Sequence, residues 1–452
     1  MANGIITNDL QVTISNRQIL KIAFPISFAI FVPQINFVTN NIFLGGLGEE
    51  SLAAAGITGV AYLIFSAIGI GLNNGLQALI ARRAGENKVE EIGKLFSQGV
   101  LISLAIAAIG ILFIYFAGSF FLHISLKSEI LQAKCIDFLR IRIWGLPFLY
   151  IYQMRNALLV GTNQSRFLIA GSLAEAITNI FFDYGFIYGK LGLPEIGFNG
   201  AAYASIIAEF TGMIVVFVVI HYKGIGKRFN LFGQFKVDRI IVTQILKQSA
   251  PLIFQYAISI ITWNFFYILV EHHGSRALAI STTMRNIFGF FGVFTWAFGA
   301  TTATMVSNII GQDMKDKVPW LIKKIAYVST AFGIVFFCLL NLFPGVFLSV
   351  FAQSDDFITD AIPVVRVVSS ALVIMSFSSV WMNAVIGTGN SKVSLVIETF
   401  TVVLYIIYVY FVLEVMQMSI VIGWMSEWVY WLSMFGLSWW YIRSGRWKKK
   451  II

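Results

Sequence analysis

Three polar residues in an otherwise apolar stretch follow one another at intervals of four: Glu175, Asn179 and Asp183. In an α-helix this spacing places all three on one face. Asn36 and Asn40 repeat the interval earlier in the chain. A carboxylate among amide oxygens, held in apolar surroundings, can take up and release a proton or bind a small cation such as Na⁺. These residues therefore predict an ion-responsive group.

The sequence offers no comparable set of residues for an enzyme. It contains no nucleophile beside a base, no phosphate-binding glycine loop and no Cys/His cluster. The adjacent His272 and His273 lack the spacing of metal ligands. We therefore predict no catalytic residue, no metal site and no cofactor other than a coupling ion.

The composition indicates what kind of protein must position these residues. Of 452 residues, 58% are hydrophobic and 12% are charged, whereas a soluble protein carries about 25% charged residues. A soluble fold of this size cannot cover so much apolar surface. The same numbers exclude a disordered or nucleic-acid-binding chain. We predict a polytopic membrane protein.

Apolar runs alternate along the chain with short charged or turn-rich breaks. About 20 helical residues cross a hydrocarbon core of about 30 Å. On this basis the sequence predicts an all-α fold with twelve transmembrane helices. Their expected limits are 18–44, 51–80, 92–121, 133–159, 165–189, 197–222, 241–270, 276–308, 318–345, 358–386, 391–414 and 417–442.

The basic residues between these helices are distributed unequally. Twenty-two lysines and arginines lie on one side of the predicted membrane and four on the other. Because basic loops stay in the cytoplasm, both termini are predicted to be cytoplasmic, in a cell inner (plasma) membrane. Arg140, Arg142 and Arg366, near the outer ends of their helices, are expected to extend their cationic groups to the membrane surface.

The two halves of the sequence correspond when the chain is shifted by half of its own length. Pro25 then meets Pro251, and glycines and arginines meet at further bends and helix ends: Gly48 with Gly274, Gly85 with Gly311, Arg140 with Arg366, Gly161 with Gly387, and Gly197 with Gly423. We predict an N-terminal lobe of six helices (1–222), a cytoplasmic linker (223–240) and a C-terminal lobe of six helices (241–452). Such parallel repeats are related by a pseudo-twofold axis along the membrane normal and are typical of transporters that work by alternating access.

Several motifs resemble those of the multidrug and toxic compound extrusion (MATE) family. The fifth predicted helix ends in residues 179–189, NIFFDYGFIYG, and residues 197–205, GFNGAAYAS, follow. Similar family segments match residues 45–48, 138–142 and 297–312, and the resemblance covers roughly residues 17–440. It implies two lobes around a V-shaped cleft and efflux of organic, often cationic, compounds in exchange for inward H⁺ or Na⁺.

The resemblance also implies roles for the polar group. Its pattern is closest to members with a coupling site in the N-terminal lobe, so Asp183 is expected to be the ion-coupling carboxylate, assisted by Asn179, Asn40, Asn36, Glu175 and Ser205. Asn40 stands where family members commonly have Asp. The seventh and tenth helices offer Gln255, Ser259, Ser376 and Ser378 instead of the carboxylates of another branch.

Further residues are candidates for the substrate cleft and for gating. Glu209, near the middle of the sixth helix, and Arg285, which could pair with a carboxylate or attract an anionic substrate, are cleft candidates. Trp263 and Phe288 could accept flat cationic compounds through cation–π contacts. Pro25, Pro33 and Pro251 are the expected bending points.

The resulting hypothesis is secondary active efflux by a monomer whose partners are a small-molecule substrate and membrane lipid. One alternative is a lipid-linked saccharide flippase of the same superfamily, which would need a more basic cleft. A second alternative, an integral membrane acyltransferase, would need a catalytic His/Asp pair at the interface, and the four scattered histidines do not supply one.

Overall fold

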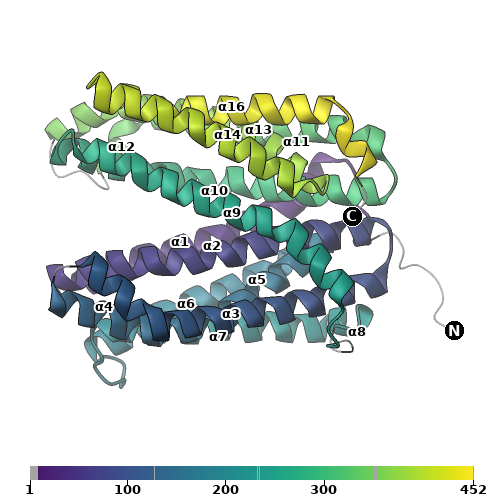
Figure 1. The fold of residues 1–452 in the computed structure, drawn as a ribbon, viewed down its shortest axis with the longest axis horizontal. Coiled ribbons are helices and arrows are strands. Elements are labelled where there is room, and N and C mark those ends of the chain that lie inside the picture. The colour runs from purple at the N-terminus through teal and green to yellow at the C-terminus, as the bar shows by residue number, and fades with distance from the viewer. Residues whose placement is uncertain (1–8, 127, 232, 234, 350–354, 451–452) are drawn as a thin grey trace. The chain divides into compact units, whose positions relative to one another are not determined.

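The structure is a computed structural model that describes residues 9–126, 128–231, 233, 235–349 and 355–450. These residues form helices joined by short turns, with no strand among them (Figure 1). The helices of the first half are α1 (Asn16–Gly45), α2 (Glu49–Gly85), α3 (Val89–Ser125), α4 (Glu129–Arg142), η1 (Ile143–Gly145), α5 (Leu146–Gly161), η2 (Ser165–Phe167), α6 (Leu168–Tyr188), α7 (Phe198–Tyr222) and α8 (Ile225–Arg228).

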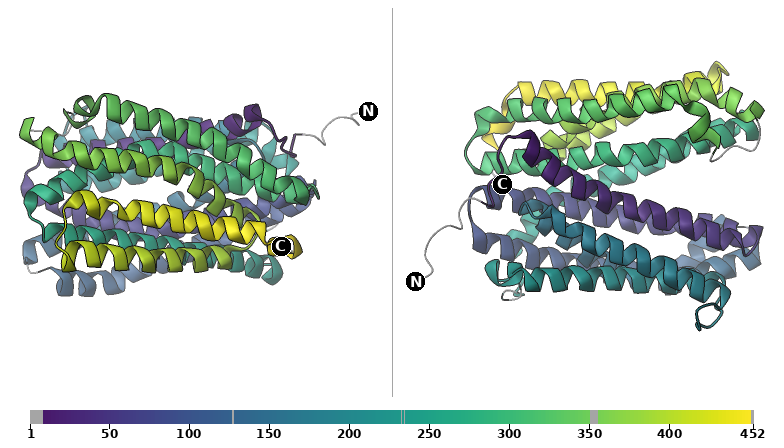
Figure 2. Two further views of the ribbon diagram at one scale, coloured as in Figure 1. Left: turned by 90° about the horizontal axis from the view of Figure 1, so that it is seen from above. Right: turned by 180° about the vertical axis from the view of Figure 1, so that it is seen from behind.

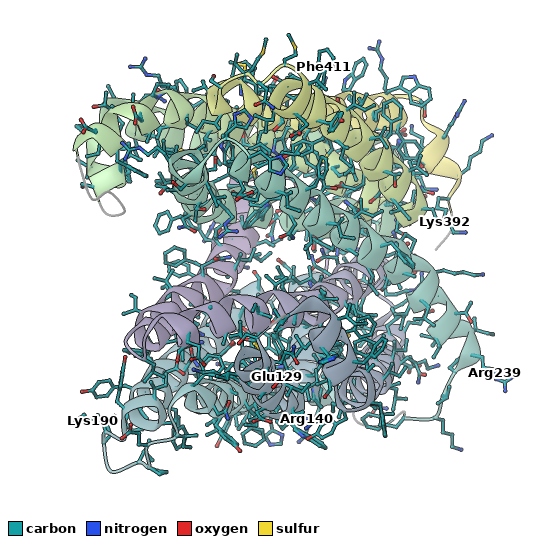
Figure 3. All side chains as sticks on the ribbon, turned by 60° about the vertical axis from the view of Figure 1, so that its left-hand side comes forward. Glu129, Arg140, Lys190, Arg239, Lys392 and Phe411 are labelled. Carbon is teal, nitrogen blue, oxygen red and sulfur yellow. The ribbon has the colours of Figure 1, made fainter. Side chains whose placement is uncertain are left out.

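The second half continues with helices of similar length. They are α9 (Arg239–Glu271), α10 (Ser275–Gly311), η3 (Lys315–Lys317), α11 (Val318–Leu342), α12 (Pro344–Ser349), α13 (Asp355–Gly387), α14 (Ser391–Val409), the π-helical η4 (Tyr410–Val415), α15 (Ile420–Trp424), α16 (Ser426–Arg443) and η5 (Arg446–Lys449). Figure 3 labels Arg239 at the start of α9 and Lys392 in the first turn of α14.

Ten helices in the described part of the chain are long and apolar enough to cross a membrane. The other two predicted spans, 133–159 and 165–189, are also helical and correspond to α4–η1–α5 and α6. Helix η1 divides the first of these spans into α4 and α5, of 14 and 16 residues, and both spans contain ionisable residues, among them Arg142, Arg155, Glu175 and Asp183. The prediction of an all-α polytopic membrane protein is confirmed.

The chain divides into two compact units, one of residues 28–253 and the other of residues 1–27 with 254–452. The boundaries lie inside α1 and α9, and half of the chain length separates them. The sequence predicts a division at the linker 223–240 instead. By contacts, the first residues of α1 therefore belong with the second half of the chain, and the first residues of α9 with the first half.

Close helix packing positions the polar residues of the unit formed by residues 28–253. Helix α6 lies against α7, and α2 lies against α5, as the views in Figures 1 and 2 also show. A Cβ atom on Gly171 of α6 would lie 3.3 Å from the backbone oxygen of Gly212 on α7. Small residues at such crossings let two membrane helices approach closely. The polar face of α6 is therefore held near α7.

Candidate functional site

Helices α1 and α6 bring together the polar residues that the sequence singled out. Asp183 and Asn179 lie one turn apart on α6 and are fully buried, with 0% and 2% of their surfaces exposed. Asn36 and Asn40 lie one turn apart on α1, and Asn36 is also buried. The spacing of four residues thus places each pair on one helix face, as predicted.

Asn40 connects the two helices. With its amide nitrogen facing the acceptors, it donates to Oδ1 of Asn179 at 3.1 Å and to Oδ2 of Asp183. The same nitrogen lies 3.2 Å from the backbone oxygen of Asn36. The remaining oxygens, Oδ1 of Asp183 and Oδ1 of Asn36, are buried and accept no hydrogen bond from the described residues. Oδ1 of Asp183 could receive a proton, and both oxygens could accept a hydrogen bond from water or bind a cation.

Two other residues of the predicted ion-coupling group, Glu175 and Ser205, lie apart from the contact of Asn40 with Asn179 and Asp183. Glu175 is on α6 two turns before Asp183 and is partly exposed. It lies within electrostatic range of Arg155, Arg142 and Glu209. Ser205, on α7, is partly exposed and forms no hydrogen bond to the group within the described ranges. The geometry therefore assembles Asn36, Asn40, Asn179 and Asp183, with Glu175 as a neighbour.

Glu209 of α7 forms a buried ion pair with Arg142 of α4. The Arg142 guanidinium donates through Nη1 to Oε2 at 2.9 Å and through Nη2 to Oε1 at 2.5 Å. The Tyr62 hydroxyl donates to Oε1 of Glu209 at 3.3 Å, and the Tyr62 ring lies 3.8 Å from the guanidinium carbon. The expectation that Arg142 extends to the membrane surface is wrong, because its partner holds it inside the protein. Arg140, labelled in Figure 3, donates to Ser119 at 3.3 Å.

Arg155 of α5 is a buried cation that the sequence-based prediction missed. Its Nη1 donates to the backbone oxygens of Gly212 at 3.2 Å and Met213 at 2.8 Å. Its Nε and Nη2 have no hydrogen-bond partner in the described part of the chain. Glu175 is the carboxylate within electrostatic range. The signal that could have revealed it is its position as the single charged residue in the apolar part, 143–159, of its predicted helix.

The second half of the chain contains a buried carboxylate that is also absent from the predicted site. Glu398 of α14 accepts hydrogen bonds from Ser259 at 2.7 Å, Tyr430 at 2.5 Å and Gln255 at 3.3 Å. Ser394 in turn donates to Oε1 of Gln255 at 2.6 Å. Both oxygens of Glu398 are therefore hydrogen-bonded, in contrast to Asp183. Its place inside the predicted span 391–414 was the available signal.

The cleft candidates of the second half are placed differently from one another. Phe288 is buried in the hydrophobic core, where its ring lies 6.2 Å from that of the partly buried Trp263. Phe288 therefore offers no free surface to a substrate in this structure. Arg285 is exposed, stacks over Tyr267 at 5.1 Å and forms no ion pair among the described residues.

All three predicted bending points lie within long helices. Pro25 and Pro33 are inside α1, and Pro251 is inside α9. Pro25 and Pro251 each precede a unit boundary by two residues. A proline inside a helix removes one backbone hydrogen bond and favours a kink. Bending at these positions stays a prediction.

Comparison with known proteins shows what the chain and its fold are similar to. The MatE family model matches residues 25–185 and again residues 251–411, two segments offset by half of the chain length. This confirms the predicted repeat. The chain is 27% identical over 237 residues to a probable multidrug resistance protein NorM of Synechocystis sp., a match that spans 52% of this chain and 51% of that protein. The chain thus covers about half the length of this relative.

Longer alignments have lower identity. A probable multidrug resistance protein NorM of Thermotoga maritima is 20% identical over 442 residues, which cover 96% of this chain and 94% of that protein. A solved structure, described as the outward-facing conformation of a multidrug resistance MATE family transporter of the MOP superfamily, matches with a TM-score of 0.88 at 20% identity. The match covers 100% of both chains and shows that the fold is the same.

Proposed function

Because the chain belongs to the MatE family, we propose that it is a secondary active transporter. In this proposal it exports small organic molecules, cationic or amphipathic in character, in exchange for ions moving inward. Relatives of the chain are named as probable multidrug resistance proteins, which supports this substrate class. The duplicated architecture supports alternating access, since transporters built from repeats commonly expose a central site to each side in turn.

The contact between Asn40, Asn179 and Asp183 carries the proposal of ion coupling. Keeping a carboxylate charged within a membrane-spanning segment costs free energy, and carboxylates retained at such positions are commonly functional. Asp183 has one oxygen bonded to Asn40 and one oxygen without a partner among the described residues. Protonation of the second oxygen would neutralise the group and leave the bond to Asn40 in place. Asp183 is thus suited to carry a proton.

We favour H⁺ over Na⁺ as the coupling ion. A small hard cation is bound by several oxygens that surround it. Here the Asn40 amide forms hydrogen bonds to Asp183 and Asn179 only when its nitrogen faces them. That orientation supplies a hydrogen-bond donor where a sodium site would need an oxygen ligand. A proton needs a single acceptor, and Oδ1 of Asp183 meets this requirement.

Transport by the purified protein in proteoliposomes tests the proposal. Vesicles loaded with a fluorescent organic cation are given a pH gradient, a Na⁺ gradient or neither. We expect dye movement driven by the pH gradient and proton movement driven by a dye gradient, without a requirement for Na⁺. Dye movement that is driven by the Na⁺ gradient and not by the pH gradient would overturn the proposal that H⁺ is the coupling ion. No movement under any gradient, with folded protein in the vesicles, would overturn the proposed function.

Glu398 permits a test of whether a second carboxylate takes part in coupling. In Glu398→Gln a new amide nitrogen would face the Gln255 nitrogen that now donates to the carboxylate. Two facing donors leave a buried group unsatisfied, so we expect a loss of about 1–3 kcal/mol in the free energy of unfolding. Because both oxygens of Glu398 are already hydrogen-bonded, we expect the number of protons moved per dye molecule to stay unchanged.

The exchanged pair Gln255→Glu with Glu398→Gln provides the control for this variant. It returns a carboxylate to the same contact, and the stability should recover in part. Proton movement that disappears in a folded Glu398→Gln protein would instead place coupling in the second half of the chain.

A further inference from the structure

The segment that precedes α1 is fastened to α10 by the side chain of Asn308. Nδ2 of Asn308 donates to the backbone oxygen of Leu10 at 2.9 Å, and Oδ1 accepts from the backbone nitrogen of Val12 at 3.1 Å. One amide thus bonds to an oxygen and a nitrogen two residues apart, as a neighbouring strand would. Leu10, Val12 and Asn308 are all buried. The N-terminal segment can be followed in purple in Figure 2.

Two further side chains hold the same segment. Nε2 of Gln312 donates to the backbone oxygen of Val12 at 3.0 Å and to Oδ1 of Asn308 at 2.8 Å. Nζ of Lys324 on α11 donates to the backbone oxygen of Ile14 at 3.3 Å. We call residues 9–15 the first strap. All these residues belong to the unit of residues 1–27 and 254–452.

The segment that precedes α9 is fastened in the same way, in the other unit. Nε2 of Gln98 on α3 donates to the backbone oxygen of Lys236 at 2.8 Å, and Oε1 accepts from the backbone nitrogen of Asp238 at 3.1 Å. Ser97 donates to the backbone oxygen of Leu231 at 2.9 Å. We call residues 235–238 the second strap.

The two straps correspond in the repeat, but the amides that hold them do not. A shift by half of the chain length turns positions 10 and 12 of the first strap into positions 236 and 238 of the second. The same shift relates Asn308 to position 82, which is an arginine, and not to Gln98. The same pair of backbone bonds is therefore made by amides at unrelated positions of different helices. A geometry that is built twice from different residues points to a requirement shared by both straps.

The helices that follow the straps suggest what this requirement is. Helices α1 and α9 contain the unit boundaries, between residues 27 and 28 and between residues 253 and 254. Each strap holds the start of its helix in one unit while the remainder of the helix belongs to the other. A movement of one unit can reach the other through a helix only if the end of that helix is held. Asn308 and Gln98 each contribute two hydrogen bonds to this hold.

We propose that Asn308 and Gln98 are positioning residues of the transport cycle. Each fixes the start of a helix shared by both units, so that a rearrangement of one unit is transmitted to the other. Neither residue touches the substrate or the coupling ion in this proposal. The inference rests on the proposed function, because only a transporter that alternates between states depends on such transmission.

Transport by variants of the full chain tests the proposal. In Asn308→Ala and Gln98→Ala we expect the maximal rate of dye transport to fall by about tenfold, since two hydrogen bonds that hold a moving element are lost. Dye binding, measured by fluorescence polarisation, should stay within about twofold of the unaltered protein. Asn308→Asp and Gln98→Glu keep the acceptor oxygen, and we expect transport rates between those of the alanine variants and the unaltered protein. These two variants serve as the test if the alanine variants do not fold.

Asn341→Ala is the matched control. Asn341 is an amide on α11 in the same unit, where it donates to Ser369 at 2.9 Å and contacts neither strap. It should lower stability without lowering the rate per folded molecule. A separate experiment tests whether the first strap is held in place. It measures how fast a thiol reagent labels the cysteine of Leu10→Cys, in a protein whose exposed Cys338 is replaced by Ser. Labelling should be slow with Asn308 present and faster in Asn308→Ala.

The outcomes separate this inference from the proposed function. If the unaltered protein moves no dye, the proposed function falls and the inference falls with it. If the unaltered protein transports dye and the strap variants transport at the same rate per folded molecule, only the inference is overturned. A loss of dye binding in parallel with rate, or an equal loss of rate in Asn341→Ala, would also overturn it.

Discussion

Replacing Asp183 with Asn should reduce proton-driven dye transport to the level of vesicles without protein. The amide cannot carry a proton between the two sides, so a pH gradient no longer drives dye movement. The fold should persist, because the Asn oxygen can accept from Asn40 in place of Oδ2. The new nitrogen would then occupy the site of Oδ1, which has no partner among the described residues. Proton movement driven by a dye gradient in proteoliposomes measures the effect.

Asp137→Asn is the matched control for this experiment. Asp137 is an exposed aspartate on α4 in the same unit. The substitution makes the same chemical change as Asp183→Asn, yet dye transport should continue at the rate of the unaltered protein. Undiminished coupled proton movement in Asp183→Asn would remove Asp183 from the coupling role.

Replacing Glu209 with Leu should destabilise the protein strongly. The substitution leaves the buried Arg142 guanidinium without its carboxylate. Breaking a buried ion pair from one side costs about 3–5 kcal/mol, because the remaining charge is no longer compensated. The double variant Arg142→Met with Glu209→Leu removes both charges and should recover most of the loss. Reversible unfolding in mixed micelles measures the free energy of unfolding of the unaltered protein, both single variants and the double variant.

The exposed pair of Arg276 and Asp360 provides the comparison. Its oxygen and nitrogen lie 2.9 Å apart, but about half of each side chain is exposed. Removing Asp360 should change the free energy of unfolding by about 0–1 kcal/mol, since water replaces the lost partner. A loss of similar size for Glu209→Leu, or a double variant no more stable than the single one, would contradict a buried, mutually dependent pair.

The contact of Asn40 with Asn179 and Asp183 could be predicted because it depends on regular geometry. A spacing of four residues sets the face of each helix, and the positions of α1 and α6 residues along their predicted spans set a similar depth. The contact of Glu209 with Arg142 could not be predicted in this way. The two residues are 67 positions apart, and their meeting depends on how α4 and α7 pack. Gly145 contributes, because a Cβ there would collide with both side chains.

The hydrogen bonds of Glu398 escaped prediction for a related reason. The residues that bind it come from α9 and α16, and no interval along the chain connects these helices. The basic residues and glycines of the segment 223–240 predict a polar linker. Its buried Phe229 and Leu231 show that part of it packs like core. Gly93 on α3 permits this packing, since any Cβ there would overlap the Phe229 backbone oxygen.

The division of α1 between the two units has a consequence for the order in which the chain is made. Residues 9–27 are synthesised before the unit of residues 28–253, but the residues that hold them, Asn308, Gln312 and Lys324, are synthesised some 300 positions later. Domains generally fold in the order of their synthesis. The unit of residues 28–253 can complete its contacts early, whereas the first turns of α1 must wait at the membrane until much of the second half has been translated.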